Sequence, residues 1–293
     1  MADWLGEVEM ANRIAFTKVE AGGNNFVLID APGMPELDWS ALAVRMCAHH
    51  FGVGADGLLA LLPSREADFR LRMFNPDGTE DACGNGLLCA AVYIRAVGLS
   101  MESELLFQAK DGLRHVEIVQ DADGSPIVRA NMGRPSLRPA DIPANLDADE
   151  ALDYPLDVGG HVYRISAVLV GTPHAVICAP LESFWANIPA ASRAIETHPA
   201  FPERINITWC FQESSESLRI RTWERGVGPT LGCGSGACAA LVAAHLRGLT
   251  GTYARVTSPG GTTEVNWPDR GDIFMSGPAN IVFKGEWSDG VLE

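Results

Sequence analysis

The chain has 293 residues, of which 47% are hydrophobic and 20% are charged. This length and apolar content are typical of a globular protein of about two domains with a large core. The formal net charge of −15 disfavours partners such as nucleic acid or an anionic membrane surface, because the protein's own field repels phosphate groups.

The beginning of the chain, MADWLGEVEMANRIAFTK, has early acidic residues and no continuous apolar stretch, so it does not resemble a secretory signal. No apolar run approaches the roughly 18 residues that a membrane-spanning helix needs. The seven cysteines, an odd number spread over a long chain, fit reduced thiols better than a disulfide framework. We therefore expect a cytoplasmic protein with no membrane contact.

The first half of the chain reads as strands interrupted by two helices. Residues 14–30 are expected to form two strands around a glycine turn, and residues 38–52 a helix with Asp38 or Ser40 as its N-cap. Further strands are expected at 57–63, 68–75, 104–110, 113–120 and 126–133, with a helix at about 84–96 and a turn at 121–124.

The second half repeats this order after residues 134–153, which are rich in Pro, Ala and Asp and read as a loop or linker. Strands are expected at 162–171, 175–180, 205–212, 217–224, 254–258, 262–268, 272–277 and 280–287, with a helix within 182–192 and another after residue 233. The repetition indicates a duplicated α+β unit with a boundary near residue 132.

Two similar phrases, CGNGLLCAAVYI at Cys83 and CGSGACAALVAA at Cys233, lie 150 positions apart. Each predicts a cysteine at the start of a helix whose first turn contains glycines, so unpaired backbone N–H groups point outward beside the sulfur. Such a site suits a carboxylate, and its partial positive charge is expected to lower the thiol pKa.

If the two sites face each other, they would hold one carboxylate between two helix N-termini, with a thiol on each side of the neighbouring carbon. One thiolate would remove an α-proton and the opposite thiol would deliver a proton to the other face, inverting the configuration. The amides would stabilise the charge that develops on the carboxylate, and no pyridoxal cofactor is needed.

The two cysteine phrases also allow simpler interpretations. A cysteine beside glycine at a helix start is commonly structural, and the two copies could be only the trace of a duplication. A zinc site is disfavoured because Cys83 and Cys89, like Cys233 and Cys238, lack the usual ligand spacing.

Five stretches of the chain are similar to signatures of the diaminopimelate epimerase family. They are FTKVEAGGNNFVLID, FNPDGTEDACGNGLLCAA, GTPHAV, FPERIN and WERGVGPTLGCGSGACAA, distributed in the family's order from about Phe16 to Gly277. The resemblance implies an α+β fold of two pseudosymmetric domains, each a curved, mostly antiparallel sheet around a central helix. The implied domains are 12–131 and 132–278, with a returning strand at about 279–288 that joins the first.

The resemblance also implies an activity. It is the interconversion of LL- and meso-diaminopimelate by two-thiol proton transfer at the α-carbon, in lysine and cell-wall precursor biosynthesis. The expected partner is a small-molecule amino-acid substrate, with no cofactor and no metal, and the family is usually a homodimer.

By resemblance, Cys83 and Cys233 are the catalytic base and acid, exchanging roles with the direction of reaction. The backbone amides expected to hold the reacting carboxylate belong to Gly84, Asn85, Gly234 and Ser235. The other expected substrate contacts are Asn24, Asn75, Thr172, Asn206, Glu224 and Arg225. Arg225 is the natural partner of the distant carboxylate.

Taken without the family, some of these residues have simpler roles. Asn75 in NPDG could start a turn, and Asn206 could be an ordinary polar residue at a strand end. Arg225 could belong to a surface ion pair. His174 could contact substrate or be purely structural.

The sequence departs from the family's common pattern at four places. Thr172 stands where an asparagine is common, Leu88 where an arginine is common, and Asn25 where an aspartate is usual, and there is one residue fewer between Asn75 and Cys83. The alternative function is therefore a pyridoxal-independent racemase of a different amino acid with the same two-cysteine mechanism. An isomerase that shifts a proton within an unsaturated acid, and a thiol-metal binding protein without catalysis, are more distant alternatives.

Overall fold

The computed structural model describes residues 13–32, 37–120, 126–178 and 188–288. The expected turn at 121–124 and the first part of the helix expected within 182–192 lie outside these ranges. Within the described residues, no helix is long and apolar enough to cross a membrane.

The first half of the chain alternates strands with two helices, as the sequence indicates. Its elements are β1 (Arg13–Ala21), β2 (Asn24–Asp30), α1 (Trp39–Cys47), β3 (Gly57–Leu62), β4 (Phe69–Phe74), β5 (Glu80–Asp81), α2 (Gly84–Val97), β6 (Glu104–Ala109), β7 (Gly112–Gln120) and β8 (Pro126–Asn131). Asp38 is the N-cap of α1, and its side chain accepts a hydrogen bond from the backbone N–H of Ala41.

The second half repeats the order. Its elements are β9 (Tyr154–Val158), β10 (His161–Val170), β11 (Thr172–Cys178), α3 (Ile188–Glu196), β12 (Asn206–Ser214), β13 (Ser217–Glu224), β14 (Gly228–Thr230), α4 (Gly234–Leu246), β15 (Tyr253–Ser258), β16 (Gly261–Asn266), a 3₁₀ turn (Pro268–Arg270), β17 (Phe274–Gly277) and β18 (Asn280–Ser288). Strands β5, β9 and β14 are not predicted by the sequence pattern, because each has five residues or fewer and includes a proline or charged residues.

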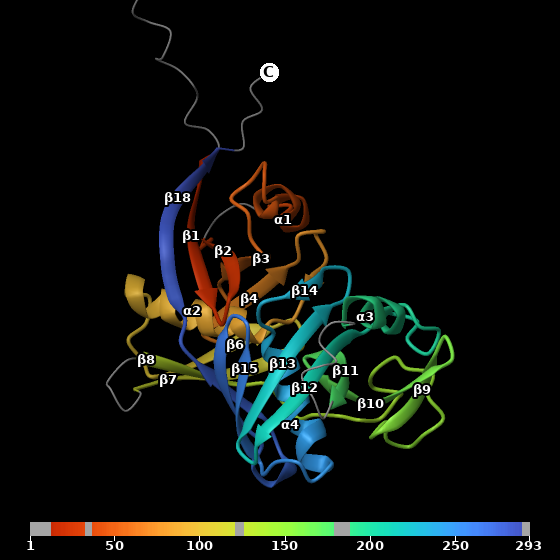
Figure 1. Ribbon diagram of the computed structural model, residues 1–293. Coiled ribbons are helices and arrows are strands. Elements are labelled where there is room, and N and C mark those ends of the chain that lie inside the picture. Colours follow the sequence, from red (N-terminus) through yellow and green to blue (C-terminus); the bar gives the residue numbers. More distant parts are fainter. Residues whose placement is uncertain (1–12, 33–36, 121–125, 179–187, 289–293) are drawn as a thin grey trace, which may run out of the picture.

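The two halves have the same strand pairing. In the first, β2 pairs with β3 and β4 with β6 in parallel, whereas β3 and β4 are antiparallel. In the second, β11 and β12 are parallel, β13 and β15 are parallel, and β12 and β13 are antiparallel. The expected pseudosymmetric α+β fold with mostly antiparallel pairing is therefore confirmed (Figure 1).

The halves are joined through one continuous sheet. β8 pairs antiparallel with β17, which links the sheet of one half to that of the other. β18 returns from the end of the chain and pairs antiparallel with β1. This pairing supports the division at residues 131 and 132, with 279–288 returning to the first domain, which we retain as a proposal.

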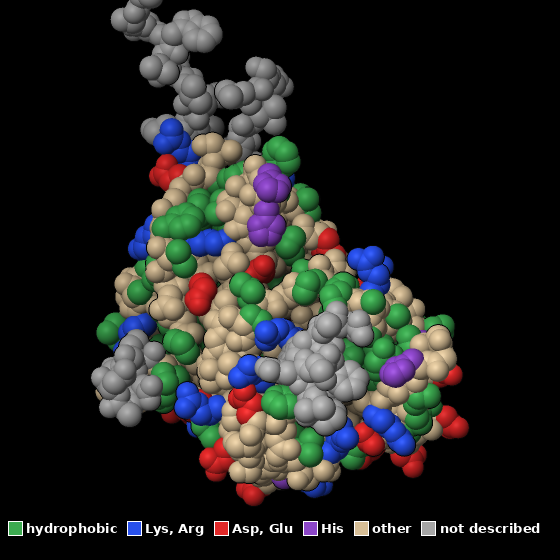
Figure 2. All heavy atoms as spheres, viewed as in Figure 1, with side chains coloured by type: hydrophobic (Ala, Val, Ile, Leu, Met, Phe, Trp, Pro, Cys, Tyr) green, Lys and Arg blue, Asp and Glu red, His purple; other side chains and the backbone are tan. Residues whose placement is uncertain are grey.

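The central helices α2 and α4 lie in the largest apolar core, between the curved sheets. Every residue of α4 from Gly234 to Ala244 is buried, because the run of alanine, glycine and cysteine lets strands pack closely on all sides. Smaller cores lie under α1 and under α3. The face seen in Figure 2 carries acidic, basic and apolar side chains interspersed.

Candidate active site

Cys83 and Cys233 have the same place and the same backbone conformation in the two halves. Each is the N-cap of a central helix, with φ −145° and ψ 112° at Cys83 and φ −144° and ψ 113° at Cys233. Cys83 Sγ accepts a hydrogen bond from the backbone N–H of Gly86 (3.3 Å). Cys233 Sγ lies 3.3 Å from Oγ of Ser235. The helix starts that the sequence predicts are thus both present.

The two helix N-termini lie close to each other because the residues that follow each cysteine are glycines. A β-carbon at Gly84 would lie 2.8 Å from Sδ of Met275, and one at Gly234 would lie at the same distance from that sulfur. The β-carbon at Gly234 would also lie 3.1 Å from Oδ1 of Asn85, which belongs to the opposite helix. A single methionine therefore packs against both helix starts, and only glycine allows this approach without a shift of its neighbours.

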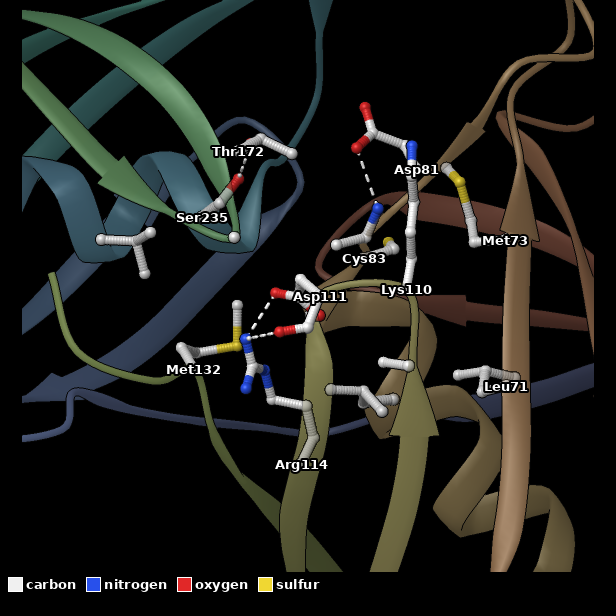
Figure 3. A pocket seen from close by; sticks show the side chains of 16 residues that line it. Leu71, Met73, Asp81, Cys83, Lys110, Asp111, Arg114, Met132, Thr172 and Ser235 are labelled. Atoms are coloured by element: carbon white, nitrogen blue, oxygen red, sulfur yellow. Dashed lines mark hydrogen bonds and ion pairs between the residues drawn. The ribbon is translucent and has the colours of Figure 1, made fainter. Parts of the chain in front are cut away.

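All twelve residues singled out in the sequence lie on one cavity of about 690 Å³. The first half contributes Asn24, Asn75, Cys83, Gly84 and Asn85, and the second contributes Thr172, Asn206, Glu224, Arg225, Cys233, Gly234 and Ser235. A smaller hollow adjoins it and shares Cys83, Thr172 and Ser235 with it (Figure 3).

The expectation that the helix N-termini lower the thiol pKa is wrong for this arrangement. Burial raises the pKa of Cys83 to about 12, with further increases from the charges of Glu224 and Asp81, although the N–H of Gly86 opposes them. Burial, followed by Glu224, raises the pKa of Cys233 well above its ordinary value. Desolvation and nearby carboxylates outweigh the helix end, so both thiols are protonated at neutral pH.

Glu224 is the ionisable group that both thiols share as a neighbour. Burial raises its pKa to about 7, and the charges of Asp56 and Asp81 act in the same direction, while a hydrogen bond from Thr230 Oγ1 (2.7 Å) opposes them. A carboxyl group with a pKa near neutrality can accept or release a proton during a reaction.

A cluster of hydroxyls lies behind Cys233. Thr172 Oγ1 and His174 Nε2 each lie 2.9 Å from Ser235 Oγ, and His174 Nδ1 lies 3.0 Å from Thr208 Oγ1. His174 is fully buried and does not line the cavity, and burial lowers its pKa to about 3. The neutral imidazole therefore orients Thr172 and Ser235, which supports the structural role for this residue.

Asn206 connects the segment around Thr172 with the one around Arg225. Its Nδ2 donates to the backbone carbonyl of Pro173 (2.9 Å), and its Oδ1 accepts from the backbone N–H of Arg225 (2.9 Å). Asn75 does start a turn, since its carbonyl accepts from the N–H of Gly78 (2.9 Å), yet it also lines the cavity. The turn-forming role and the functional role of Asn75 are therefore compatible.

The structure accounts for two of the departures from the family pattern. Leu88 is buried in the core, so this side chain makes no polar contribution to the cavity. Asn25 donates from its side chain and its backbone to Oδ2 of Asp56 (2.6 and 2.8 Å). Asp56 lines the cavity and thus supplies a carboxylate beside Asn25.

Sequence reasoning missed three residues that shape the site, namely Met275, Asp56 and Asp81. Met275 comes from β17 and has no motif around it, and its position depends on tertiary packing alone. Asp56 and Asp81 stand close to recognised motifs, but only the folded chain shows which carboxylates face the cavity.

Comparison with known proteins agrees with this geometry. The family model for diaminopimelate epimerase matches residues 16–138 and 166–282. The chain belongs to the diaminopimelate epimerase family. Diaminopimelate epimerase of Pelotomaculum thermopropionicum is 42% identical over 276 residues, covering 93% of this chain and 98% of the relative. That of Desulforudis audaxviator is 44% identical over 277 residues, with the same two shares. Family membership makes the protein an isomerase.

Solved structures share the epimerase fold at low identity. A hydroxyproline epimerase from Agrobacterium vitis has a TM-score of 0.72 at 15% identity, covering 96% of this chain and 94% of the other. A PhzF-family protein from Bacillus anthracis has a TM-score of 0.71 at 18% identity, covering 94% and 99%. At these identities the likeness concerns the fold alone.

Proposed function

We propose that this chain interconverts LL- and meso-diaminopimelate, with Cys83 and Cys233 transferring protons on opposite faces of the α-carbon. The observation that carries this proposal is the presence of two equivalent N-cap cysteines on one cavity, at helix ends that share Met275 as a neighbour. Family membership supplies the substrate, since the curated relatives are diaminopimelate epimerases.

The reacting carboxylate would bind at the two helix N-termini. The first-turn N–H groups of Gly84, Asn85, Gly234 and Ser235 have no partner within their own helices. These donors are fixed before substrate binds, so they would stabilise the extra negative charge that the carboxylate gains when the α-proton leaves. The glycines allow the carboxylate to approach the backbone.

The protonated resting state of both thiols requires a proton acceptor. We assign this role to Glu224, whose pKa of about 7 leaves it partly ionised near neutral pH. Movement of the Cys83 proton to Glu224 would produce a thiolate beside a neutral carboxyl group. This removes the charge repulsion from Glu224 that adds to the effect of burial on the thiol pKa. That thiolate then takes the α-proton, and Cys233 gives its proton to the opposite face. The proton held by Glu224 then passes to the Cys233 thiolate, which restores the protonated state of both thiols. In the reverse direction the two thiols exchange roles.

The far end of the substrate would lie toward Arg225. The guanidinium group is the natural partner of the far carboxylate. Asn206 fixes the backbone of Arg225, and Asn24 and Asn75 line the cavity as further polar contacts. This chemistry uses side chains and backbone amides of the chain, and we propose no cofactor and no metal.

We retain two further expectations as proposals. One is a homodimer, which light scattering on the purified protein would test. The other is a cytoplasmic location, which the seven free cysteines support.

The test of the proposed function is incubation of the reduced protein with LL-diaminopimelate, followed by chiral separation of the products. We expect meso-diaminopimelate to form until the two isomers reach equilibrium. An unchanged LL isomer, with conversion of a different amino acid in a panel of about twenty, would contradict the substrate assignment and favour the alternative racemase.

A further inference from the structure

An ion pair crosses the active-site cavity between the two halves of the molecule. Arg225, in the turn between β13 and β14, places Nη2 3.4 Å from Oδ2 of Asp81, on β5. Both side chains line the same cavity as the catalytic thiols, and they are 30% and 22% exposed. Asp81 matches none of the residues that the family resemblance assigns to the substrate.

We propose that Asp81 is a specificity-determining residue that binds the far ammonium group of the substrate while Arg225 binds the far carboxylate. This inference rests on the proposed function and adds to it a residue that binds the far ammonium group. Diaminopimelate carries an ammonium group and a carboxylate on one far carbon, so a receptor for that end needs an acidic group beside a basic one.

The position of Asp81 is fixed by the chain around it. Its backbone pairs with Met73 of β4, and its Oδ1 accepts a hydrogen bond from the N–H of Ala82 (2.9 Å). The second oxygen, Oδ2, is the one that faces Arg225. Figure 3 shows Asp81 on the same side of the hollow as Cys83, with Thr172 and Ser235 on the opposite side.

The neighbouring carboxylates are engaged elsewhere. Glu80 accepts two hydrogen bonds from the guanidinium group of Arg72 (2.9 and 2.8 Å). Asp77 accepts from the side chain and backbone of Thr79, and Asp56 accepts from Asn25. Glu224 accepts a hydrogen bond from Thr230 and is assigned to proton transfer with the thiols. Asp81 is therefore the carboxylate best placed to meet a cation that lies against Arg225.

The pair itself is weak enough to open. It is a single contact at 3.4 Å, rather than the two short parallel bonds that make arginine and carboxylate pairs strong. An incoming ammonium group and carboxylate can each replace one member of the pair, so that neither Asp81 nor Arg225 is left without a partner of opposite charge.

The test measures steady-state kinetics with LL-diaminopimelate for the wild type, Asp81→Asn and Asp81→Glu. It also measures competitive inhibition by 2-aminopimelate, which lacks the far ammonium group, and by lysine, which lacks the far carboxylate. Glu102→Gln removes one carboxylate at an exposed position that does not line the cavity, and it is the control for the change in charge.

We expect Asp81→Asn to raise KM for diaminopimelate by about 10- to 100-fold, with kcat changed less than about threefold, because a hydrogen bond to a charged group is lost. Inhibition by lysine should weaken by a similar factor, and inhibition by 2-aminopimelate should not change. Asp81→Glu should recover most of the affinity, and Glu102→Gln should match the wild type.

Two results would overturn the inference. Equal weakening of diaminopimelate and 2-aminopimelate would show that Asp81 only positions Arg225, and tighter binding of both would show that Asp81 merely competes for Arg225. A wild-type enzyme inert toward diaminopimelate would instead contradict the proposed function, and that result is obtained before any variant is compared.

Discussion

Individual side chains in this cavity derive their chemistry from burial more than from their neighbours along the chain. The thiol of Cys83 stands at a helix N-terminus, yet its pKa is raised to about 12 because desolvation and the charge of Glu224 exceed the effect of the Gly86 N–H. The same burial keeps His174 neutral and leaves Glu224 with a pKa of about 7. Because the thiols are protonated and His174 is neutral, Glu224 is the group in this cavity that can exchange a proton with the thiols near neutral pH.

The hydroxyl group of Thr172 is expected to matter for activity. It lies within hydrogen-bond distance of Ser235 Oγ (2.9 Å), His174 Nε2 (3.2 Å) and Asn206 Nδ2 (3.4 Å). Thr172→Val keeps the shape and removes these contacts, and we expect kcat/KM for diaminopimelate to fall about tenfold or more.

Thr222→Val is the matched control for this change, since Thr222 is also buried but its hydroxyl has no hydrogen-bond partner among the described residues. We expect kcat/KM of this variant to stay within about twofold of the wild type. A Thr172→Val variant as active as Thr222→Val would show that the hydroxyl cluster does not position the site.

The raised pKa of Glu224 predicts how stability depends on pH. The folded state holds the proton up to about pH 7, whereas the ordinary value is 4.5. The resulting stabilisation is complete below about pH 4.5 and is lost as the pH rises through 7. Glu224→Gln should therefore gain about 2 to 3 kcal/mol relative to the wild type between pH 4.5 and pH 8, in urea unfolding at each pH. A difference in unfolding free energy between the two proteins that does not change with pH would contradict the raised pKa of Glu224.

At the scale of elements, the active site is the meeting point of two helix starts. Helices α2 and α4 begin with the same N-cap residue and nearly the same dihedral angles, and both pack their first glycine against Met275. The cavity therefore depends on the close approach of these helices as much as on any single functional group.

This close approach can be tested with Gly234→Ala. The added β-carbon would lie 2.8 Å from both Sδ and Cε of Met275, which forces the helix start or the methionine to shift. Overpacking of this kind costs about 1 to 3 kcal/mol. We expect kcat/KM to fall at least about tenfold. The double variant Gly234→Ala with Met275→Ala should recover part of this kcat/KM, because the shorter side chain at 275 removes the clash.

Gly251→Ala provides the comparison, because no atom of the described chain lies within 4 Å of a β-carbon at that position. Kinetic constants of Gly251→Ala should equal those of the wild type. If Gly234→Ala behaved in the same way, the proposed approach of the two helices would be wrong.

At the scale of the whole molecule, the fold closes through its last strand. β18 pairs along most of β1, and the rings of Phe16 and Phe283 meet edge to face with centroids 6.0 Å apart. The sheet of the first half thus gains an outer strand, β18, that follows the second half in the sequence.

A chain that ends at residue 278 should consequently be destabilised as a whole. Loss of β18 leaves one edge of β1 unpaired and removes the partner that packs on Phe16, so we expect a thermal midpoint lower by about 10 °C or more, or an insoluble product. A chain that ends at Ser288 retains all of β18 and is the control. Equal thermal midpoints for the two chains, measured by circular dichroism, would contradict this prediction.

The sequence predicts most of the strands and the presence of the described α-helices, because the alternation of apolar residues is strong and both cysteine motifs mark helix starts. Two helix ends differ from the prediction: α1 ends at Cys47 rather than near Gly52, and α3 continues to Glu196 rather than ending by Ser192. It also predicts twelve of the residues that line the cavity, through the family motifs. It does not predict the direction of the thiol pKa shifts, since desolvation depends on the atoms that enclose Cys83 after folding. Met275 and Asp81 could not be identified either, because their roles depend on contacts between the two halves.

The central claim is that one thiol removes the α-proton and the other delivers its replacement. The most direct measurement is proton NMR of LL-diaminopimelate in D₂O with the reduced wild type, Cys83→Ala and Cys233→Ala. We expect loss of the α-proton signal with formation of the meso isomer in the wild type, and no conversion to the meso isomer in either variant. Epimerisation that persists in one of the single-thiol variants would contradict the two-thiol account.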